Sequence, residues 1–425
     1  MSRGVLAAVA RTVAGAVLAL APMGMAFAAG FELDTFGIKQ FGANLAGAAA
    51  YAPDATALGY NPAGMMALHG THISVSATAV QLRGDFSGRA YDTAQQPPQP
   101  VSGGNGGDFG GDYAIPAFFM TRRVSPRWAL GMGLYSKYDT VTDYRNGWTG
   151  RYNANLSSIK SADFNPVVAF KATRTLSFGA GFYLEYFRAR LTNAVDLTGG
   201  AAPGAFDVSS DLHGDDITAG VTAGMTWQPL AGTRFGLSYR SPTTAHVSGK
   251  LDVSGHGVRQ VNRGNVDVPL PAEVMFGVSQ SVGRRFTLLA GAEWFGWNRF
   301  GNLNVHLDDG RTIVIPQNYD NSWRLSGGAA VDVSAGWTLR AGLAYDQSPV
   351  SSPSRDARVP DSDRLEVTAG ASFSPGEAWT FDVGYMHVFF HRASIDNLDT
   401  SRTYRLQGHY NDSSDLLGVQ ADYRF

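Results

Sequence analysis

The chain of 425 residues has no cysteine, few charged residues (16%) and a formal net charge of only −2. The lack of cysteine fits an oxidising compartment, where free thiols would mispair. The near-neutral balance lacks the basic excess of nucleic-acid-binding proteins, so we expect no nucleic-acid partner. After residue 29, no stretch approaches the roughly eighteen continuous apolar residues of a transmembrane helix.

Signatures of catalysis and metal binding are also missing. The sequence has no G-x-S-x-G motif, and its nine histidines show no metal spacing such as H-E-x-x-H. An H-x-S triplet runs from His72 to Ser74, but no partner carboxylate can be placed beside it. We therefore expect no cofactor, no metal and no enzymatic activity, with a barrel lipase or deacylase as the alternative.

The first residues have the three parts of a secretory signal peptide. Arg3 and Arg11 give a positive start, the run TVAGAVLALAPMGM is short and apolar, and Ala26-Phe27-Ala28 forms an A-x-A cleavage site. This pattern predicts a signal peptide over residues 1–28 and a mature chain that begins near Ala29.

From residue 72 to residue 425, about fourteen segments alternate apolar and other residues at the length of a tilted membrane strand. Short turn-like connections such as SVGRR alternate with long linkers such as DQSPVSSPSRDARVPDSD. This alternation predicts an all-β, antiparallel outer-membrane β-barrel of about fourteen strands, with tight periplasmic turns and long outer loops. We interpret Trp128 and Trp297 as aromatic residues at the membrane interface.

The segment 29–71 precedes the first strand and is rich in small residues. Asn61 and Pro62 have the types of a helix N-cap and first helical residue, and Ala63 follows them. A barrel of this size has a lumen wide enough for water. We expect the segment to fill that lumen as a hatch, because Phe41, Tyr60 and similar apolar residues do not suit a solvated linker.

Several motifs together resemble the FadL/TodX family of outer-membrane transporters of fatty acids and hydrocarbons. The opening AGFEL, the N-P-A motif of YNPAGM and the ending ADYRF are similar to the family's. A signature of the form D-x-S-P-V…P-D-x-D-R is matched by Asp346, Ser348, Pro349, Val350, Pro360, Asp361, Asp363 and Arg364. The resemblance implies a monomeric fourteen-stranded barrel in the outer membrane of a Gram-negative bacterium, among its lipid and lipopolysaccharide. It also implies passive transport, with capture at the outer loops, binding inside the barrel and lateral release through a kinked third strand.

The resemblance also suggests residues that contact the substrate. Phe31 stands where the family has an apolar hatch tip, and Arg188 aligns with a basic position that could pair with a carboxylate or simply be solvated. The loop residues Phe206, Ile313 and Ile315 could form an outer capture groove or pack against other loops. Gly131 and Gly133 are candidates for the kink that opens the wall.

The cargo stays open at this level. Long-chain fatty acids and aromatic hydrocarbons both suit a route in which burial contributes about 0.8 kcal/mol per methylene group. A general porin for polar solutes is a further alternative, but it would need no hatch.

Overall fold

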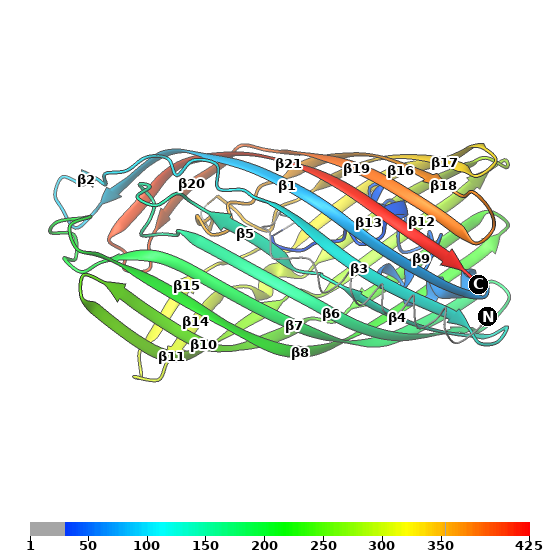
Figure 1. Ribbon diagram of the computed structural model, residues 1–425, viewed down its shortest axis with the longest axis horizontal. Helices are drawn as coiled ribbons and strands as arrows, with labels where there is room; N and C mark the ends of the chain where they lie inside the picture. The colour runs from blue at the N-terminus through cyan, green and yellow to red at the C-terminus, as the bar shows by residue number, and fades with distance from the viewer. Residues whose placement is uncertain (1–29, 353) are drawn as a thin grey trace.

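The computed structural model describes residues 30–352 and 354–425 as one long β-barrel with residues 30–70 inside it (Figure 1). The predicted signal peptide, residues 1–28, lies outside the described residues. Fourteen spans form the wall, and several of them consist of two strands in succession. β1 pairs with both β21 and β3, so the sheet closes on itself.

The strands of the first seven spans are β1 (Thr71–Asp92), β3 (Asp112–Arg123), β4 (Trp128–Tyr135) with β5 (Asp139–Asp143), β6 (Leu156–Lys171), β7 (Leu176–Asp196), β8 (Asp207–Leu230), and β9 (Thr233–Arg240) with β10 (Thr243–Gly255). Those of the other seven are β11 (Val258–Leu270) with β12 (Glu273–Val282), β13 (Phe286–Phe295) with β14 (Asn302–Leu307), β15 (Thr312–Pro316) with β16 (Ser322–Ser334), β17 (Trp337–Asp346), β18 (Arg364–Phe373), β19 (Trp379–Phe390) with β20 (Ala393–Leu398), and β21 (Tyr404–Arg424). A short strand, β2 (Gln99–Pro100), adds to the end of β1.

The connections alternate in length as predicted, but two expected linkers are strands. Tight turns and the C-terminus share one end of the barrel, and the longer loops lie at the other (Figure 1). The stretch SGHGVRQVNRG (254–264), which the sequence pattern predicts as a linker, lies in the hairpin of β10 and β11, and the predicted linker VHLDDGRTIVIPQ (305–317) lies in the hairpin of β14 and β15. The residues of these two hairpins are polar enough to resemble loops. They are polar because the hairpins extend the barrel on its long-loop side.

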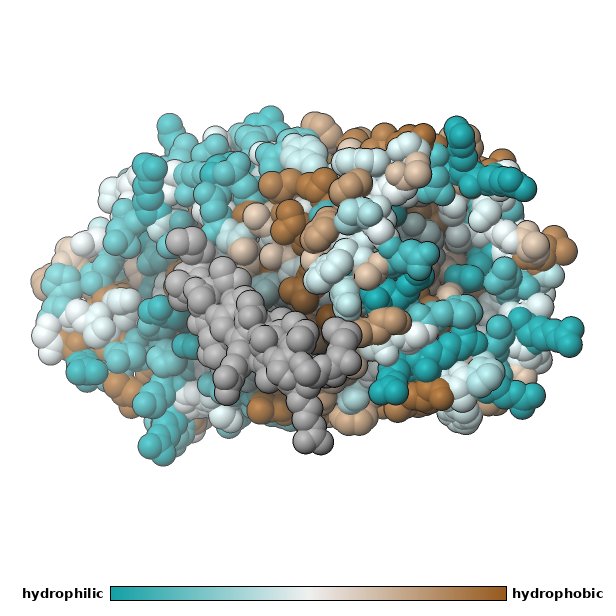
Figure 2. All heavy atoms as spheres, turned by 45° about the vertical axis from the view of Figure 1, so that its right-hand side comes forward, coloured by the Kyte–Doolittle hydropathy of each residue, from teal (hydrophilic) through white to brown (hydrophobic). Residues whose placement is uncertain are grey.

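The outer face carries an apolar band, as expected for a wall that contacts lipid. Exposed side chains that alternate with buried ones include Phe182 and Leu184 on β7, Leu339 and Leu343 on β17, and Leu417 on β21. Figure 2 shows hydrophobic residues spread over the right-hand part of one face and a mainly hydrophilic left-hand end. Among the described residues, no helix is long and apolar enough to cross a membrane.

The lumenal segment, residues 30–70, fills the half of the barrel near the tight turns (Figure 1). It contains the short helices α2 (Ile38–Phe41), α3 (Ala57–Tyr60) and the 3-10 helix η1 (Pro62–Ala67). The Asn61 Oδ1 atom accepts a hydrogen bond from the Ala63 amide at 3.0 Å, so Asn61 caps η1 as predicted. The Asn61 amide group also donates to the carbonyls of Ala49 and Met225, at 2.7 and 3.0 Å. One side chain thus shapes the segment and attaches it to β8.

Glycines of the wall let this segment approach the strands closely. A Cβ atom at Gly236 would lie 1.9 Å from the Ala49 carbonyl oxygen, and one at Gly224 would lie 2.0 Å from Asn61 Oδ1. Gly179, Gly277 and Gly342 have similar contacts with the segment's backbone. These glycines therefore lie where the lumenal segment packs directly against the wall of the barrel.

A buried ion cluster holds the segment on the opposite side. The Lys39 ammonium lies 2.6 Å from Asp422, 3.3 Å from Asp54 and 3.5 Å from Asp382. Burial alone would lower the pKa of Lys39, but the three carboxylates outweigh it and raise that pKa above its ordinary value. Lys39 is thus a permanent cation between the lumenal segment and the strands β19 and β21.

Candidate substrate-binding site

The third span is interrupted between β4 and β5. The ladder between β3 and β4 ends at the pair Phe118–Leu134, while β5 pairs only with β6. Residues 112–117 of β3 therefore have no ladder partner on the third span. The Ser161 hydroxyl lies within hydrogen-bond distance of the amides of Lys137 and Tyr138, which supports the chain at the break.

The start of the lumenal segment pairs with this break. Glu32 and Tyr138 form an isolated antiparallel bridge, with Leu33 N donating to Lys137 O at 2.7 Å and Asp139 N donating to Phe31 O at 3.0 Å. The broken span thus gains its β-partner from inside the barrel. A shift of residues 31–33 would leave these backbone groups without partners.

Phe31 belongs to an aromatic cluster beside the break. Its ring centroid lies 4.8 Å from that of Trp297, 5.6 Å from Phe300 and 5.7 Å from Tyr138. Phe31 and Trp297 are both fully buried. The cluster therefore connects the bridge at the break to the apolar interior.

An apolar cavity with about 60 Å³ of free space lies in the same apolar cluster as Phe31. Aliphatic and aromatic side chains dominate its lining, which consists of Ile159, Phe187, Ala189, Leu191, Leu212, His213, Gly214, Val247, Gly249, Gly264, Asn265, Val266, Val268, Phe300, Leu303, Val305 and Ile315. A hydrophobic guest would lose its contact with water here and would find few polar partners.

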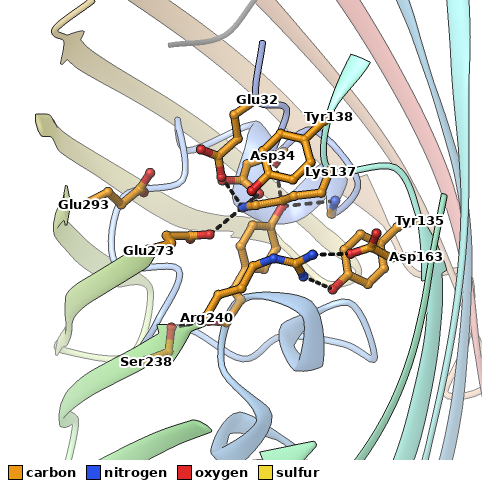
Figure 3. Close-up of polar contacts among 12 residues, drawn as sticks. Glu32, Asp34, Tyr135, Lys137, Tyr138, Asp163, Ser238, Arg240, Glu273 and Glu293 are labelled. Atoms are coloured by element: carbon orange, nitrogen blue, oxygen red, sulfur yellow. Dashed lines mark hydrogen bonds and ion pairs between the residues drawn. The ribbon is translucent and has the colours of Figure 1, made fainter. Parts of the chain in front are cut away.

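A layer of charged side chains lies on the periplasmic side of this cavity. The Lys137 ammonium is 2.7 Å from each of Glu32, Asp34 and Glu273 (Figure 3). These three carboxylates are close enough together to hold a metal ion, and Lys137 occupies the centre of the group. Burial raises the pKa of Glu32 well above its ordinary value, and Lys137 only partly offsets that effect.

Three arginines extend the layer around the wall. Arg240 pairs with Asp163 at 2.7 Å (Figure 3) and with Glu185 at 2.9 Å. Arg324 pairs with Glu293 and Glu366, at 3.3 and 2.7 Å. Arg364 pairs with Asp346 and Asp361, at 2.8 and 3.1 Å. We call these arginines, Lys137 and their carboxylate partners the lumenal charge layer.

Comparison with known proteins identifies the family. A family model described as "Outer membrane protein transport protein (OMPP1/FadL/TodX)" matches residues 19–425. This chain is a member of the FadL/TodX family. The prediction made from the motifs is confirmed, and with it the location of this FadL/TodX member in the outer membrane.

Relatives of this FadL/TodX member are similar along most of their length. The long-chain fatty acid transport protein of Escherichia coli O6:H1 is 23% identical over 398 residues, which cover 85% of this chain and 87% of the relative. Outer membrane protein P1 of Haemophilus influenzae is 23% identical over 447 residues, which cover 95% and 96%.

Solved structures show the same fold. A Pseudomonas aeruginosa FadL homologue aligns with a TM-score of 0.88 at 23% identity, over 93% of this chain and all of that chain. The Ralstonia pickettii toluene transporter TbuX aligns with a TM-score of 0.66 at 19% identity, over 92% and 98%. The predicted fourteen-stranded barrel is therefore confirmed for this FadL/TodX member.

The structure brings three of the predicted site residues together. Phe31 lies in the aromatic cluster, Ile315 lines the cavity, and Ile313 is partly buried against the same apolar cluster. All three therefore belong to the interior rather than to an outer groove. Their roles in binding stay a prediction.

Arg188 and Phe206 lie away from the cavity. On β7, the neighbours Phe187 and Ala189 line the cavity, so Arg188 points to the outer face and is exposed. It therefore does not reach a carboxylate inside the barrel. Phe206 precedes β8 at the long-loop end, where it is 54% exposed and its ring centroid lies 5.6 Å from that of His256.

Gly131 and Gly133 lie just before the break. Both are in the continuous ladder of β4, opposite Thr121 and Phe119 of β3. A Cβ atom at Gly131 would lie 2.5 Å from Met65 Sδ, and one at Gly133 would lie 2.7 Å from the Phe119 ring. The interruption itself falls at Ser136 to Tyr138. The two glycines give space for packing, and the third span breaks after them.

The interpretation of Trp297 as an interface residue is wrong, because the side chain is fully buried beside Phe31. Trp128, by contrast, is 47% exposed on the outer face. Sequence analysis also missed Lys137 and Tyr138. The sequence signal for these two residues was weak. The residues SKY interrupt the alternation after WALGMGLY, and this interruption does not show which way either side chain points.

Proposed function

We propose that this protein carries hydrophobic molecules through the outer membrane by passive diffusion. The apolar cavity beside Phe31 supports the proposal most directly, because its walls suit a guest that water solvates poorly. The relatives named as long-chain fatty acid transport proteins and the toluene transporter TbuX suggest the chemical range of the cargo.

We further propose that the lumenal segment acts as the hatch of a barrel formed by residues 72–425, after removal of a signal peptide over 1–28. Residues 31–33 connect the cavity to the break, since Phe31 belongs to the apolar cluster around the cavity and its neighbours pair with residues 137–139. A guest that displaces Phe31 would also weaken the bridge at the break. Release would then follow sideways, between β3 and β5.

We also propose that the protein works without catalysis and as a single chain. The Ser74 hydroxyl donates to Asp422 while His72 Nε2 lies 2.9 Å from the His69 carbonyl, so the H-x-S triplet forms no catalytic dyad. One chain closes the barrel through β1 and β21. On the outer face, Lys160 and Arg188 are direct cross-strand partners beyond Tyr186, a position that suits the phosphates of lipopolysaccharide.

An uptake experiment with a filled cavity tests the proposal. Cells that lack their own transporter would express the wild type, Ala189→Trp or the control Arg188→Ala, matched for protein in the outer membrane. The indole at residue 189 should occupy the cavity and reduce uptake of labelled toluene or oleate by about tenfold or more, the effect of losing about 1.4 kcal/mol of binding. Arg188→Ala should transport like the wild type. Unchanged uptake by Ala189→Trp, or no uptake by the wild type, would contradict the proposal.

A further inference from the structure

We infer that the cavity selects uncharged hydrophobic molecules and discriminates against carboxylates. The inference rests on the proposed function and names the class of its cargo. It comes from the lumenal charge layer, in which two carboxyl groups belong to inward-facing residues two positions below a cavity-lining or cluster residue on the same strand. Glu185 precedes Phe187 in this way on β7, and Glu293 precedes Phe295 on β13.

Two residues of a strand span about 7 Å, so an anion in the cavity lies well within range of this layer. The layer contains far more acids than bases. Three carboxyl groups surround Lys137, and two surround each of Arg240, Arg324 and Arg364, which makes nine carboxyl groups for four cations. A carboxylate guest would therefore approach a surface that is richer in carboxyl groups than in cations.

The four cations are also already engaged. Each lies in an ion pair with at least two carboxyl groups of the protein, so none is free to receive a carboxylate from a guest. The unsatisfied atoms in the layer are carboxyl oxygens, among them Glu185 Oε1, Glu293 Oε2 and Asp346 Oδ1, which have no hydrogen-bond partner among the described residues. A guest anion would add another acceptor to this set.

The cavity lining itself offers no compensating charge. Its one titratable side chain among the described residues is that of His213, whose Nδ1 lies 3.3 Å from Asp211. Arg188 and Arg190, the cations next to the cavity residues of β7, both point outward. A neutral hydrocarbon, alcohol or ester would keep all the apolar contacts of the cavity and would avoid the cost of burying an unpaired anion.

The test compares two ligands that differ in charge and little else. Purified full-length protein in detergent micelles would be titrated calorimetrically with 1-decanol and with decanoate at pH 8, where decanoate is ionised. We expect decanol to bind about tenfold more tightly or better. Equal affinities, or tighter binding of decanoate, would overturn the inference. Failure of both ligands to bind would contradict the proposed function itself, and the inference with it.

A pair of cavity variants makes the test independent of ligand solubility. Leu212 lines the cavity, so Leu212→Lys would place one ammonium group within it, while Leu212→Met keeps the size without the charge. We expect Leu212→Lys to shift the ratio of affinities toward decanoate by about tenfold, and Leu212→Met to keep the wild-type ratio. If Leu212→Lys folds but leaves the ratio unchanged, charge does not set the selectivity, and the inference fails.

Discussion

At the scale of single residues, Lys137 and Glu32 carry the contact between the lumenal segment and the break. Three carboxylates from two parts of the chain surround Lys137: Glu32 and Asp34 of the lumenal segment, and Glu273 of β12. One ammonium cannot neutralise three carboxylates. This imbalance and burial both favour a bound proton, in agreement with the raised pKa of Glu32.

The contact should therefore depend on pH. The Glu32 carboxyl group has a higher pKa when the segment is docked than when it is released, so docking favours its protonated form. Docking therefore weakens as the pH rises from the ordinary range of glutamate toward that higher pKa. We expect the Leu33 and Asp139 amides, which make the bridge, to lose hydrogen-exchange protection as the pH is raised from 5 to 8. Glu32→Gln should reduce this dependence. If the protection of these amides instead rises with pH in the wild type, the expected direction of the pH dependence is wrong.

The sequence predicted the role of a residue only where that role depends on its immediate neighbours in the chain. Asn61 could be assigned as an N-cap because its role depends on the next two residues. Trp297 and Arg188 could not be placed, because each position depends on which face of a span is turned inward, and both faces of those segments are mixed. A shift of one residue in register exchanges the two faces of a strand.

At the scale of elements, the fit between the lumenal segment and the wall depends on small residues in neighbouring strands. Gly236 faces Gly277 and Gly179 faces Gly224 in the ladders, so close approach occurs at adjacent positions around the barrel. The sequence shows that glycine is frequent in the strands, but only the fold shows which glycines contact the segment. Gly327 has nothing within 4 Å of an added Cβ atom.

These two kinds of glycine provide a matched pair of variants. Gly236→Ala places a methyl group 1.9 Å from the Ala49 carbonyl oxygen, so the segment must move, at a cost of about 1–3 kcal/mol. We expect this variant to show increased ion conductance in planar bilayers, because a displaced segment no longer fills the lumen. Gly327→Ala should conduct like the wild type. Equal conductance of the two variants would contradict the assigned contact.

At the scale of the whole molecule, the barrel is a closed wall with one interrupted span, and the interruption is covered from inside. The number of strands and the alternation of connection lengths were predictable because strand length and turn chemistry are local properties. The resemblance implied a kink in the third strand, but the position of the break within that span was not predictable, because it depends on backbone pairing between residues about a hundred positions apart, such as Glu32 and Tyr138. The cavity and the charge layer likewise exist only once the sheet has closed.

If cargo passes only when residues 31–33 leave the break, a reversible cross-link at the bridge should stop transport. Glu32 and Tyr138 form a non-hydrogen-bonded antiparallel pair, where Cα atoms lie about 4.5 Å apart, and the chain has no other cysteine to interfere. Cells that express Glu32→Cys/Tyr138→Cys would be assayed for uptake of labelled toluene before and after oxidation, with each single variant as a control. We expect oxidation to lower uptake to that of cells without the protein, a reductant to restore it, and the single variants to respond to neither. If fully cross-linked protein takes up toluene as fast as it did before oxidation, residues 31–33 do not need to leave the break.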